Sequence, residues 1–127
     1  MSHRSRLFAV IIDVPGVDRE AATRFWAAAL GAEAAVEEHE PQFTSLAHGL
    51  VAAALQEIEG DGPRYHLDFE TDDLDAEVGR LRALGAEPVS RYLDCHVLRA
   101  PGGHLLCVIP RHTDAALFDA TARTWDG

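Results

Sequence analysis

Hydrophobic and polar positions along this chain change period in a regular order, and each change predicts a new element. Leu7–Val14 is a short apolar run rich in β-branched residues, and Pro15–Gly16 ends it, which predicts a strand followed by a turn. The next segment predicts a helix between Asp18, a suitable N-cap, and Gly31, a left-handed stop. The apolar positions of this helix repeat at helical spacing, at Ala22, Phe25, Trp26, Ala29 and Leu30.

We expect the Phe25–Trp26 pair of this helix to pack in the core. After the helix, the apolar runs become as short as single strands. Three strands joined by hairpin turns are predicted, at Ala34–Glu38, Phe43–Ala47 and Leu50–Ile58. The turns are predicted at Glu40–Pro41 and His48–Gly49, and a loop rich in turn-forming residues follows at Glu59–Pro63.

The same order of elements begins again after that loop. Arg64–Glu70 alternates between an apolar face and a polar face, which predicts a half-buried strand. The apolar face carries Tyr65, Leu67 and Phe69, and the polar face carries His66, Asp68 and Glu70. A second helix is predicted from an N-cap at Asp72 or Asp73 to Gly85, with a buried stripe of Leu74, Val78, Leu81 and Leu84. Three further strands are predicted at Glu87–Arg91, Cys95–Arg99 and His104–Ile109.

The pentapeptide ALGAE occurs at Ala29–Glu33 and again at Ala83–Glu87. In both copies it follows the apolar stripe of a predicted helix, supplies the glycine that stops the helix, and leads into a strand. The repeat therefore marks two β-α-β-β-β units, one over about residues 6–59 and the other over about residues 64–110.

Composition limits the class of protein that this pattern describes. The chain has 127 residues, of which 47% are hydrophobic and 25% are charged, as in ordinary globular proteins, so we expect one domain over residues 1–127. Acidic residues outnumber basic ones by 21 to 11, and the formal net charge is −10. This charge argues against binding to nucleic acids and to anionic membranes.

Two further features indicate a cytoplasmic protein. The apolar run near the N-terminus ends at Asp13, which is too short for a membrane-spanning helix, and no small-residue cleavage site follows it. Cys95 and Cys107 lie in strand-like runs without a dense cysteine framework, so we expect free buried thiols.

Four features together resemble the vicinal oxygen chelate superfamily, and more narrowly a glyoxalase-like domain of the glyoxalase/bleomycin-resistance/dioxygenase group. They are the paired βαβββ pattern, the Asp–x(6)–Phe–Trp helix running into Leu30–Gly31, the segment HLDFETDDLDAEVGRLRALGAEPV, and the segment APGGHLLCVIP. The resemblance covers residues 6–110. It implies an α+β fold in which two βαβββ units form a curved mixed sheet, with a concave ligand-binding cleft between them and the helices outside.

In metal-dependent members of this superfamily, the first and fourth strands of each unit supply His, Gln or Glu ligands to a divalent metal. His66 matches one of these positions, but the corresponding strand of the first unit, Leu7–Ile12, is entirely apolar. Cys107 stands where the family has a glutamate, and Gln56 is the only donor on its face of the other strand. We therefore expect no bound metal or other cofactor; if a metal binds, its ligands would be His66, Cys107 and Gln56.

Other polar residues are predicted for the same cleft. Asp13 would share a face with Ala9 and Ile11, while Asp68 and Glu70 share the face of His66. Such acids suit general acid–base catalysis beside an imidazole, or they are solvated at the rim or paired with arginines. A two-residue turn at Pro101–Gly102 would place His96 beside Cys107, and a turn one residue longer or shorter would place Cys95 there.

Residues 111–127 extend beyond the part of the chain that shows the resemblance. Apolar side chains recur there at roughly helical spacing, at Ala115, Leu117, Phe118, Ala122 and Trp125. A short helix would pack Phe118 and Trp125 either on its own chain or on a twofold partner, and we expect a homodimer because the family often pairs.

These features favour a protein that binds a small molecule in a cleft lined by Asp13, Gln56, His66, Asp68, His96 and Cys107. It would either sequester its ligand or act as a metal-independent lyase or isomerase with His66 as the catalytic residue. Two alternatives remain: a metal-dependent lyase or dioxygenase of the same superfamily, and a dimeric interaction module whose cleft is filled by side chains.

Overall fold

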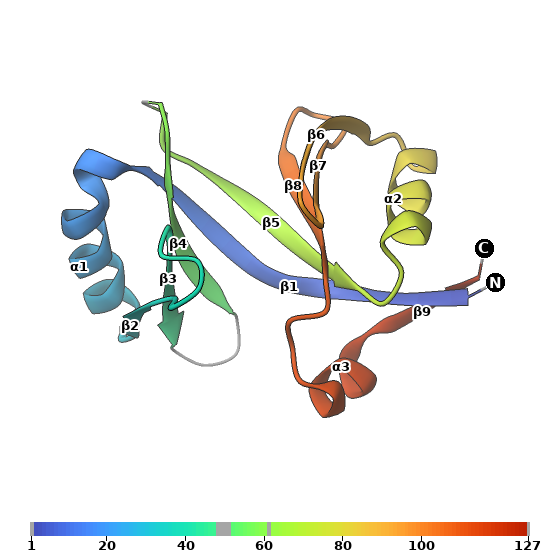
Figure 1. Cartoon of the computed structure of the whole chain (residues 1–127), viewed down its shortest axis with the longest axis horizontal. Helices are drawn as coiled ribbons and strands as arrows, with labels where there is room; N and C mark the ends of the chain where they lie inside the picture. The colour runs from blue at the N-terminus through green and yellow to red at the C-terminus, as the bar shows by residue number, and fades with distance from the viewer. Residues whose placement is uncertain (1, 48–51, 61, 127) are drawn as a thin grey trace. The chain divides into compact units, whose positions relative to one another are not determined.

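The computed structural model describes residues 2–47, 52–60 and 62–126, which form nine strands, three α-helices and one 3-10 turn (Figure 1). The chain divides into two compact units. The first unit is Ala9–His66, and the second unit joins Met1–Phe8 to Leu67–Gly127. Strands β1 (Ser2–Pro15) and β5 (Arg64–Thr71) each contribute residues to both units. Within the described residues, no helix has both the length and the apolar character needed to cross a membrane.

The first unit is a mixed sheet with one helix beside it. Its strands lie in the order β2 (Glu33–Val36), β3 (Phe43–Ala47), β4 (Ala53–Ile58) and β1. Neighbouring strands are antiparallel except β4 and β1, which are parallel. A turn, Gly16–Asp18, leads from β1 into α1 (Arg19–Leu30). The core of this unit consists of Ile12, Val14, Leu46 and Leu55, against which Trp26 and several alanines pack.

Helix α1 confirms its predicted ends but not its predicted buried face. It begins directly after Asp18, although the Asp18 side chain makes no capping hydrogen bond, and it ends at Gly31 with a φ of 66°. Trp26 packs against the core, as expected. The prediction for Phe25 was wrong, because the residue is 62% exposed, although its ring makes an edge-to-face contact with Trp26.

The second unit repeats the arrangement. Its strands lie in the order β5, β8 (Leu105–Pro110), β7 (Cys95–Arg99) and β6 (Glu87–Tyr92), and only β5 and β8 are parallel. Helix α2 (Leu74–Ala83) packs beside this sheet (Figure 1). Ala86, Leu98, Leu106 and Val108 form the core, and Leu74, Val78, Leu81 and Phe69 pack against it. The predicted stripe of α2 is therefore confirmed except at Leu84, which is 68% exposed.

The two ALGAE segments have the predicted structural role. Gly31 and Gly85 both have positive φ, of 66° and 116°, a conformation that glycine adopts without a Cβ penalty. Each segment ends at the first residue of a strand, Glu33 of β2 and Glu87 of β6. The α+β class with two βαβββ units is thus confirmed, whereas the predicted turn at His48–Gly49 lies outside the described residues.

Strand β5 has the predicted alternation with the opposite burial. His66, Asp68 and Glu70 are buried, while Tyr65 is 61% and Leu67 is 39% exposed. Only Phe69 of the apolar face packs in a core. Periodicity separates the two faces of a strand but does not say which face is covered. The polar face of β5 is therefore held inside the protein, where each of its groups requires a partner.

The C-terminal extension packs on its own chain, within the second unit. Helix α3 (Ala115–Thr121) buries Phe118 completely, and β9 (Arg123–Asp126) pairs with the first residues of β1. The predicted helix is shorter than expected, because Trp125 belongs to β9. Its indole Nε1 donates a hydrogen bond to Ser5 Oγ at 3.0 Å, and Arg80 lies 3.9 Å above its ring.

Candidate functional site

A buried carboxylate–imidazole contact joins the last part of β1 to the first part of β5 within the first unit. Asp13 Oδ2 accepts a hydrogen bond from His66 Nδ1 at 2.7 Å. The side chains are 1% and 9% exposed, respectively. Arg64 Nε donates to the same oxygen at 3.3 Å from a more exposed position. Asp13 Oδ1 is buried and has no hydrogen-bond partner among the described residues.

This contact defines the chemistry available to the imidazole. A carboxylate that accepts from Nδ1 fixes the ring in the tautomer with a proton on Nδ1, so Nε2 is the basic nitrogen of the neutral ring. The carboxylate also stabilises the imidazolium that forms when Nε2 takes a proton, and burial strengthens this interaction by lowering the local dielectric constant. The pair can therefore act as an oriented general base.

Gln56 lies next to this pair. It is the register partner of Asp13 in the parallel pairing of β1 with β4, so both side chains project from the same face of the sheet. The opposite face carries Ile12, Val14 and Leu55, which pack toward α1. Ala9 and Ile11, on the face of Asp13, are buried and apolar. The first unit thus brings together three of the predicted site residues, Asp13, Gln56 and His66.

Asp68 and Cys107 lie side by side in the second unit. They are register partners of the parallel strands β5 and β8, and both are 8% exposed. His66 precedes Asp68 by two residues on β5, so their side chains leave the strand on the same side. One ligand atom from each of His66, Asp68 and Cys107 lies within 4.8 Å of the other two.

The donor chemistry of these three residues decides which metal ion they fit. Imidazole, carboxylate and thiolate are all zinc ligands, and three protein ligands leave a position open for water or substrate. Hard ions such as Mg²⁺ prefer oxygen ligands, which a thiolate does not provide. The group fits a zinc-type ion, and it differs from the predicted set because Asp68 takes the place of Gln56. If such an ion binds, His66, Asp68 and Cys107 would hold it, and it would act as a Lewis acid.

His96 does not lie beside Cys107, so that prediction was wrong. The turn between β7 and β8 has three residues, Pro101–Gly103, because the N–H of Ala100 bonds to the carbonyl of His104. In the resulting register, Val97 faces Cys107 and His96 faces Val108. Val108 belongs to the core on the α2 side, so His96 projects from the opposite face of the sheet to Cys107. The alternative with Cys95 beside Cys107 is also wrong, because Val97 is the register partner of Cys107.

Glu70 shares the buried face of β5 but has a structural role. Its carboxylate accepts hydrogen bonds from the backbone N–H groups of His112 and Thr113, from the Thr113 hydroxyl and from Arg6. Burial raises the pKa of Glu70, but these hydrogen bonds outweigh burial and hold the pKa below its ordinary value. The carboxylate is thus hydrogen-bonded by Arg6 and by the segment that follows β8.

Sequence reasoning placed Asp13 and His66 in one cleft but did not predict their contact. It considered Asp68 and Glu70 as partners of His66, because they are close to it in sequence, whereas Asp13 is 53 residues away. One signal pointed to Asp13: it is a charged residue that ends a run of buried apolar residues. An ionisable group in such a position usually has a partner.

Comparisons with known proteins agree with this architecture. Residues 9–109 match the family model of a glyoxalase-like domain. No curated protein is similar enough in sequence to count as a match.

Several solved structures are similar in fold, at low sequence identity. A methylmalonyl-CoA epimerase from Mycobacterium tuberculosis has a TM-score of 0.50 at 21% identity, over 87% of this chain and 91% of that chain. A glyoxalase/bleomycin resistance protein/dioxygenase superfamily member from Vibrio splendidus 12B01 has a TM-score of 0.50 at 19% identity, over 78% and 94%. A xylose isomerase-like TIM barrel/4-hydroxyphenylpyruvate dioxygenase fusion protein has a TM-score of 0.59 at 20% identity, and this chain covers 94% of its own length but only 21% of the fusion protein.

Proposed function

Because this chain belongs to the glyoxalase-like domain family of the vicinal oxygen chelate superfamily, we propose that it binds a small organic molecule at the face of the first unit that carries Asp13, Gln56 and His66. The observation that carries the proposal is the buried hydrogen bond between His66 Nδ1 and Asp13 Oδ2. A buried, oriented imidazole is costly to maintain for packing alone, because its polar atoms lose their hydration. Asp68 and Cys107 are proposed to contribute to the same ligand site.

The reaction that suits this pair is the removal of an acidic C–H proton, as in an isomerase or a lyase. His66 Nε2 takes the proton from a carbon next to a carbonyl group, and the electron pair of the broken C–H bond moves into the carbonyl as an enolate forms. Return of the proton from His66 to the neighbouring carbon, on the same face, gives isomerisation when that carbon carries the oxygen of an enediolate, and departure of a neighbouring leaving group gives elimination. Asp13 keeps the imidazole oriented and stabilises its positive charge in either case.

Among proteins of similar structure, the Mycobacterium tuberculosis protein is named as an epimerase, which changes configuration at carbon. At 21% identity, this likeness shows the fold alone. Proton transfer at carbon therefore belongs to the proposal for this chain, and the Asp13–His66 geometry is its support.

Deuterium exchange tests the proton transfer without knowledge of the natural substrate. The protein is incubated in D₂O with a panel of small 2-oxo acids, α-hydroxy ketones and acyl thioesters, and loss of the α-proton signal is followed by ¹H NMR. We expect catalysed exchange with at least one compound, and a decrease of roughly 100-fold or more in His66→Gln, since general bases contribute about 10²–10⁴-fold. Asp13→Asn should also decrease the rate, because an amide can hold the imidazole in the wrong tautomer.

His104→Gln is the matched control, because it removes an exposed imidazole from the same chain. Equal exchange rates in the wild type and in His66→Gln would contradict the general-base role. Saturable binding of a compound without exchange would instead support the sequestering form of the function, in which the same residues hold a ligand that is not converted.

The donor group of His66, Asp68 and Cys107 favours a second candidate, a metal-dependent lyase or dioxygenase. Elemental analysis of protein purified without an affinity tag or chelator tests this candidate. About one equivalent of zinc or iron in the wild type, lost in both His66→Ala and Cys107→Ala, would replace the metal-independent proposal. Metal content unchanged in both variants would exclude binding by this donor group.

The proposal also includes a homodimer. The net charge of −10 supports the further proposal that the protein binds neither nucleic acids nor anionic membranes.

The third candidate, an interaction module whose cleft is filled, depended on where the C-terminal extension packs. Phe118 contacts Arg4, and Trp125 contacts Arg80. All four residues belong to the second unit, so both bulky side chains pack within that unit.

A further inference from the structure

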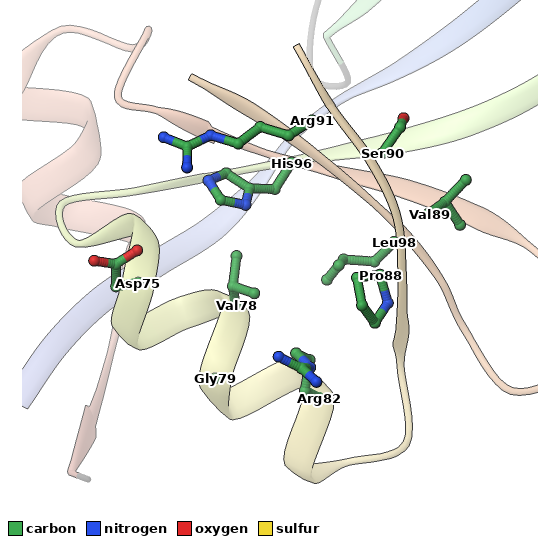
Figure 2. Close-up of a pocket in the computed structure, with 10 residues that line it drawn as sticks. All are labelled: Asp75, Val78, Gly79, Arg82, Pro88, Val89, Ser90, Arg91, His96 and Leu98. Carbon is green, nitrogen blue, oxygen red and sulfur yellow. The ribbon is translucent and has the colours of Figure 1, made fainter. Parts of the chain in front are cut away.

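A groove of about 440 Å³ lies between α2 and the strands β6 and β7 of the second unit (Figure 2). Its apolar wall consists of Val78, Pro88 and Leu98, and its polar lining includes Asp75, Arg82, Arg91 and His96. Arg91 and His96 are cross-strand partners, so their side chains leave the sheet together toward the helix. The volume is in the range of small-molecule sites, which combine apolar walls with a few polar groups.

This groove is separate from the proposed site at Asp13 and His66. His96 and Leu98 lie on the α2 side of the sheet, whereas Cys107 and Asp68 lie on the other side. None of the residues that line the groove belongs to the first unit. The groove therefore requires an explanation of its own.

Two arginines, Arg82 and Arg91, line the groove. Among the described residues, neither Arg82 nor Arg91 forms an ion pair, and the only hydrogen bond from the Arg91 guanidinium goes to the carbonyl of Leu93 at 3.2 Å. The single acid in the lining, Asp75, leaves an excess of positive charge. This is unusual in a chain whose acidic residues outnumber its basic ones by 21 to 11.

The first unit provides an internal comparison. A groove between α1 and the strands β2 and β3 is also lined by two arginines, Arg19 and Arg24. There both guanidiniums are occupied: Arg19 bonds to Glu57, Thr44 and the carbonyl of Pro41, and Arg24 bonds to Glu20. Each unit thus has two arginines in its groove, and within the described ranges only those of the second unit lack an acidic partner.

His96 adds a buried polar atom to the lining. Its Nε2 is buried and makes no hydrogen bond among the described residues, a state that costs free energy unless a ligand or water completes it. Figure 2 shows the imidazole next to the Arg91 side chain, above Val78 of α2. A ligand atom that accepts hydrogen bonds could therefore meet the imidazole and the guanidinium at the same end of the groove.

Gly79 is the residue of α2 that lines the groove without a side chain. A glycine in a helix interior lowers stability by about 0.5–1 kcal/mol relative to alanine, yet a Cβ at Gly79 would meet nothing within 4 Å. Packing therefore does not require this glycine. When the two ALGAE segments are aligned, the position equivalent to Gly79 in α1 is Phe25, so the first unit has a large side chain where the second unit has none.

From these observations we infer that the groove between α2 and β6–β7 is a second ligand site, which binds a small organic anion with one charged group. Its carboxylate or phosphate group is held by Arg91 and His96, with Arg82 at the helix side, and its short apolar body lies along Val78, Pro88 and Leu98. Asp75 disfavours ligands that carry a second acidic group along the groove. The site does not depend on the proposed function of Asp13 and His66.

Titrations of the ¹⁵N-labelled full chain test the inference with three probes of equal chain length: hexanoate, hexyl phosphate and hexanamide. We expect at least one anion to shift the amide signals of residues 78–82 and 88–98 saturably, and hexanamide to bind at least about tenfold more weakly, since it lacks the charge. The two anions distinguish a carboxylate ligand from a phosphate ligand. Arg91→Gln should weaken the preferred anion by about tenfold or more.

Gly79→Phe adds an aromatic side chain at a position that lines the groove and should weaken binding of the preferred anion. Ala83→Phe is its matched control, because it adds the same exposed ring to α2 outside the groove lining. Asp13→Asn should bind the anion as the wild type does. The inference is overturned if neither anion binds saturably, if hexanamide binds equally well, or if Arg91→Gln leaves the affinity unchanged.

Discussion

Among single residues, Glu77 shows how this protein compensates a fully buried charge. Its carboxylate lies inside the second unit with 0% of the residue exposed. It accepts hydrogen bonds from Arg80 at 2.7 and 2.8 Å, from Ser5 at 2.7 Å and from His3 at 2.8 Å. Burial raises the pKa of Glu77, but these three partners outweigh burial and hold the pKa below its ordinary value of 4.5.

This lowered pKa predicts how stability depends on pH. A carboxyl group with a lower pKa in the folded state stabilises the protein above its unfolded pKa, and the contribution is lost as pH falls through the folded value. We expect Glu77→Gln to lower the free energy of unfolding at pH 7 by about 3 kcal/mol, since it breaks a buried charged network. The loss should begin to shrink as pH decreases below about 4.5, where the unfolded chain takes up a proton, and should approach zero below the lowered pKa of the folded state, where the wild-type carboxyl is protonated as well.

Urea denaturation between pH 2.5 and pH 7 measures this effect, and Glu87→Gln, at an exposed position, is the control. Glu70 also has a lowered pKa, so the variant should retain part of the acid dependence. A constant difference between wild type and Glu77→Gln across this pH range would show that the network stabilises the fold through geometry rather than charge.

Individual site residues were predictable only in part, for a physical reason. The chain pattern and the family resemblance identified His66, and the apolar run before Asp13 placed that acid on a buried strand. Their contact joins positions 53 residues apart and depends on how β1 and β5 are arranged in three dimensions. The position of His96 depended on one residue of turn length, because a shift of one residue moves every side chain to the other face.

Secondary-structure elements were more predictable where their ends depend on local chemistry. Both ALGAE glycines end a helix as expected, and Asp73 caps α2 through a hydrogen bond that its side chain accepts from the N–H of Ala76 at 3.1 Å. Asp18 precedes α1 in the same way but makes no such bond, because a 3-10 turn leads into that helix. The position of an aspartate before each apolar stripe therefore identified both helix starts, but it did not show which aspartate forms a capping hydrogen bond.

The two aspartates make a matched pair for testing the capping bond. Asp73→Ala should lower the free energy of unfolding by about 1 kcal/mol, the usual loss when an N-cap side chain is removed. Asp18→Ala removes an equivalent charge near a helix start without breaking a capping bond, so its effect should be at most about half as large. Chemical denaturation at pH 7 measures both; equal losses would mean that the charge, and not the hydrogen bond, stabilises these helix starts.

On the scale of the whole chain, the two ends come together within the second unit. Residues Ser2–Ser5 of β1 pair with Arg123–Asp126 of β9, and Figure 1 shows β9 beside the first part of β1. Phe118 anchors the connection between β8 and β9: it is 0% exposed, with Arg4 and Arg111 5.0 and 5.4 Å from its ring. The sequence predicted an apolar extension but not its docking surface, since periodicity does not identify the partner of an apolar face.

Phe118 therefore determines whether the chain ends stay attached. Phe118→Ala should lower the free energy of unfolding of the second unit by about 3–5 kcal/mol, the usual loss when a buried phenylalanine is truncated. Leu117→Ala is the control, because Leu117 is the preceding residue of α3 and is 46% exposed. In hydrogen exchange, Phe118→Ala should remove protection from residues 2–5 and 123–126 before it affects the first unit, because the pairing of β1 with β9 depends on the anchored helix. Uniform loss of protection over the whole chain would show instead that both units unfold as one cooperative body.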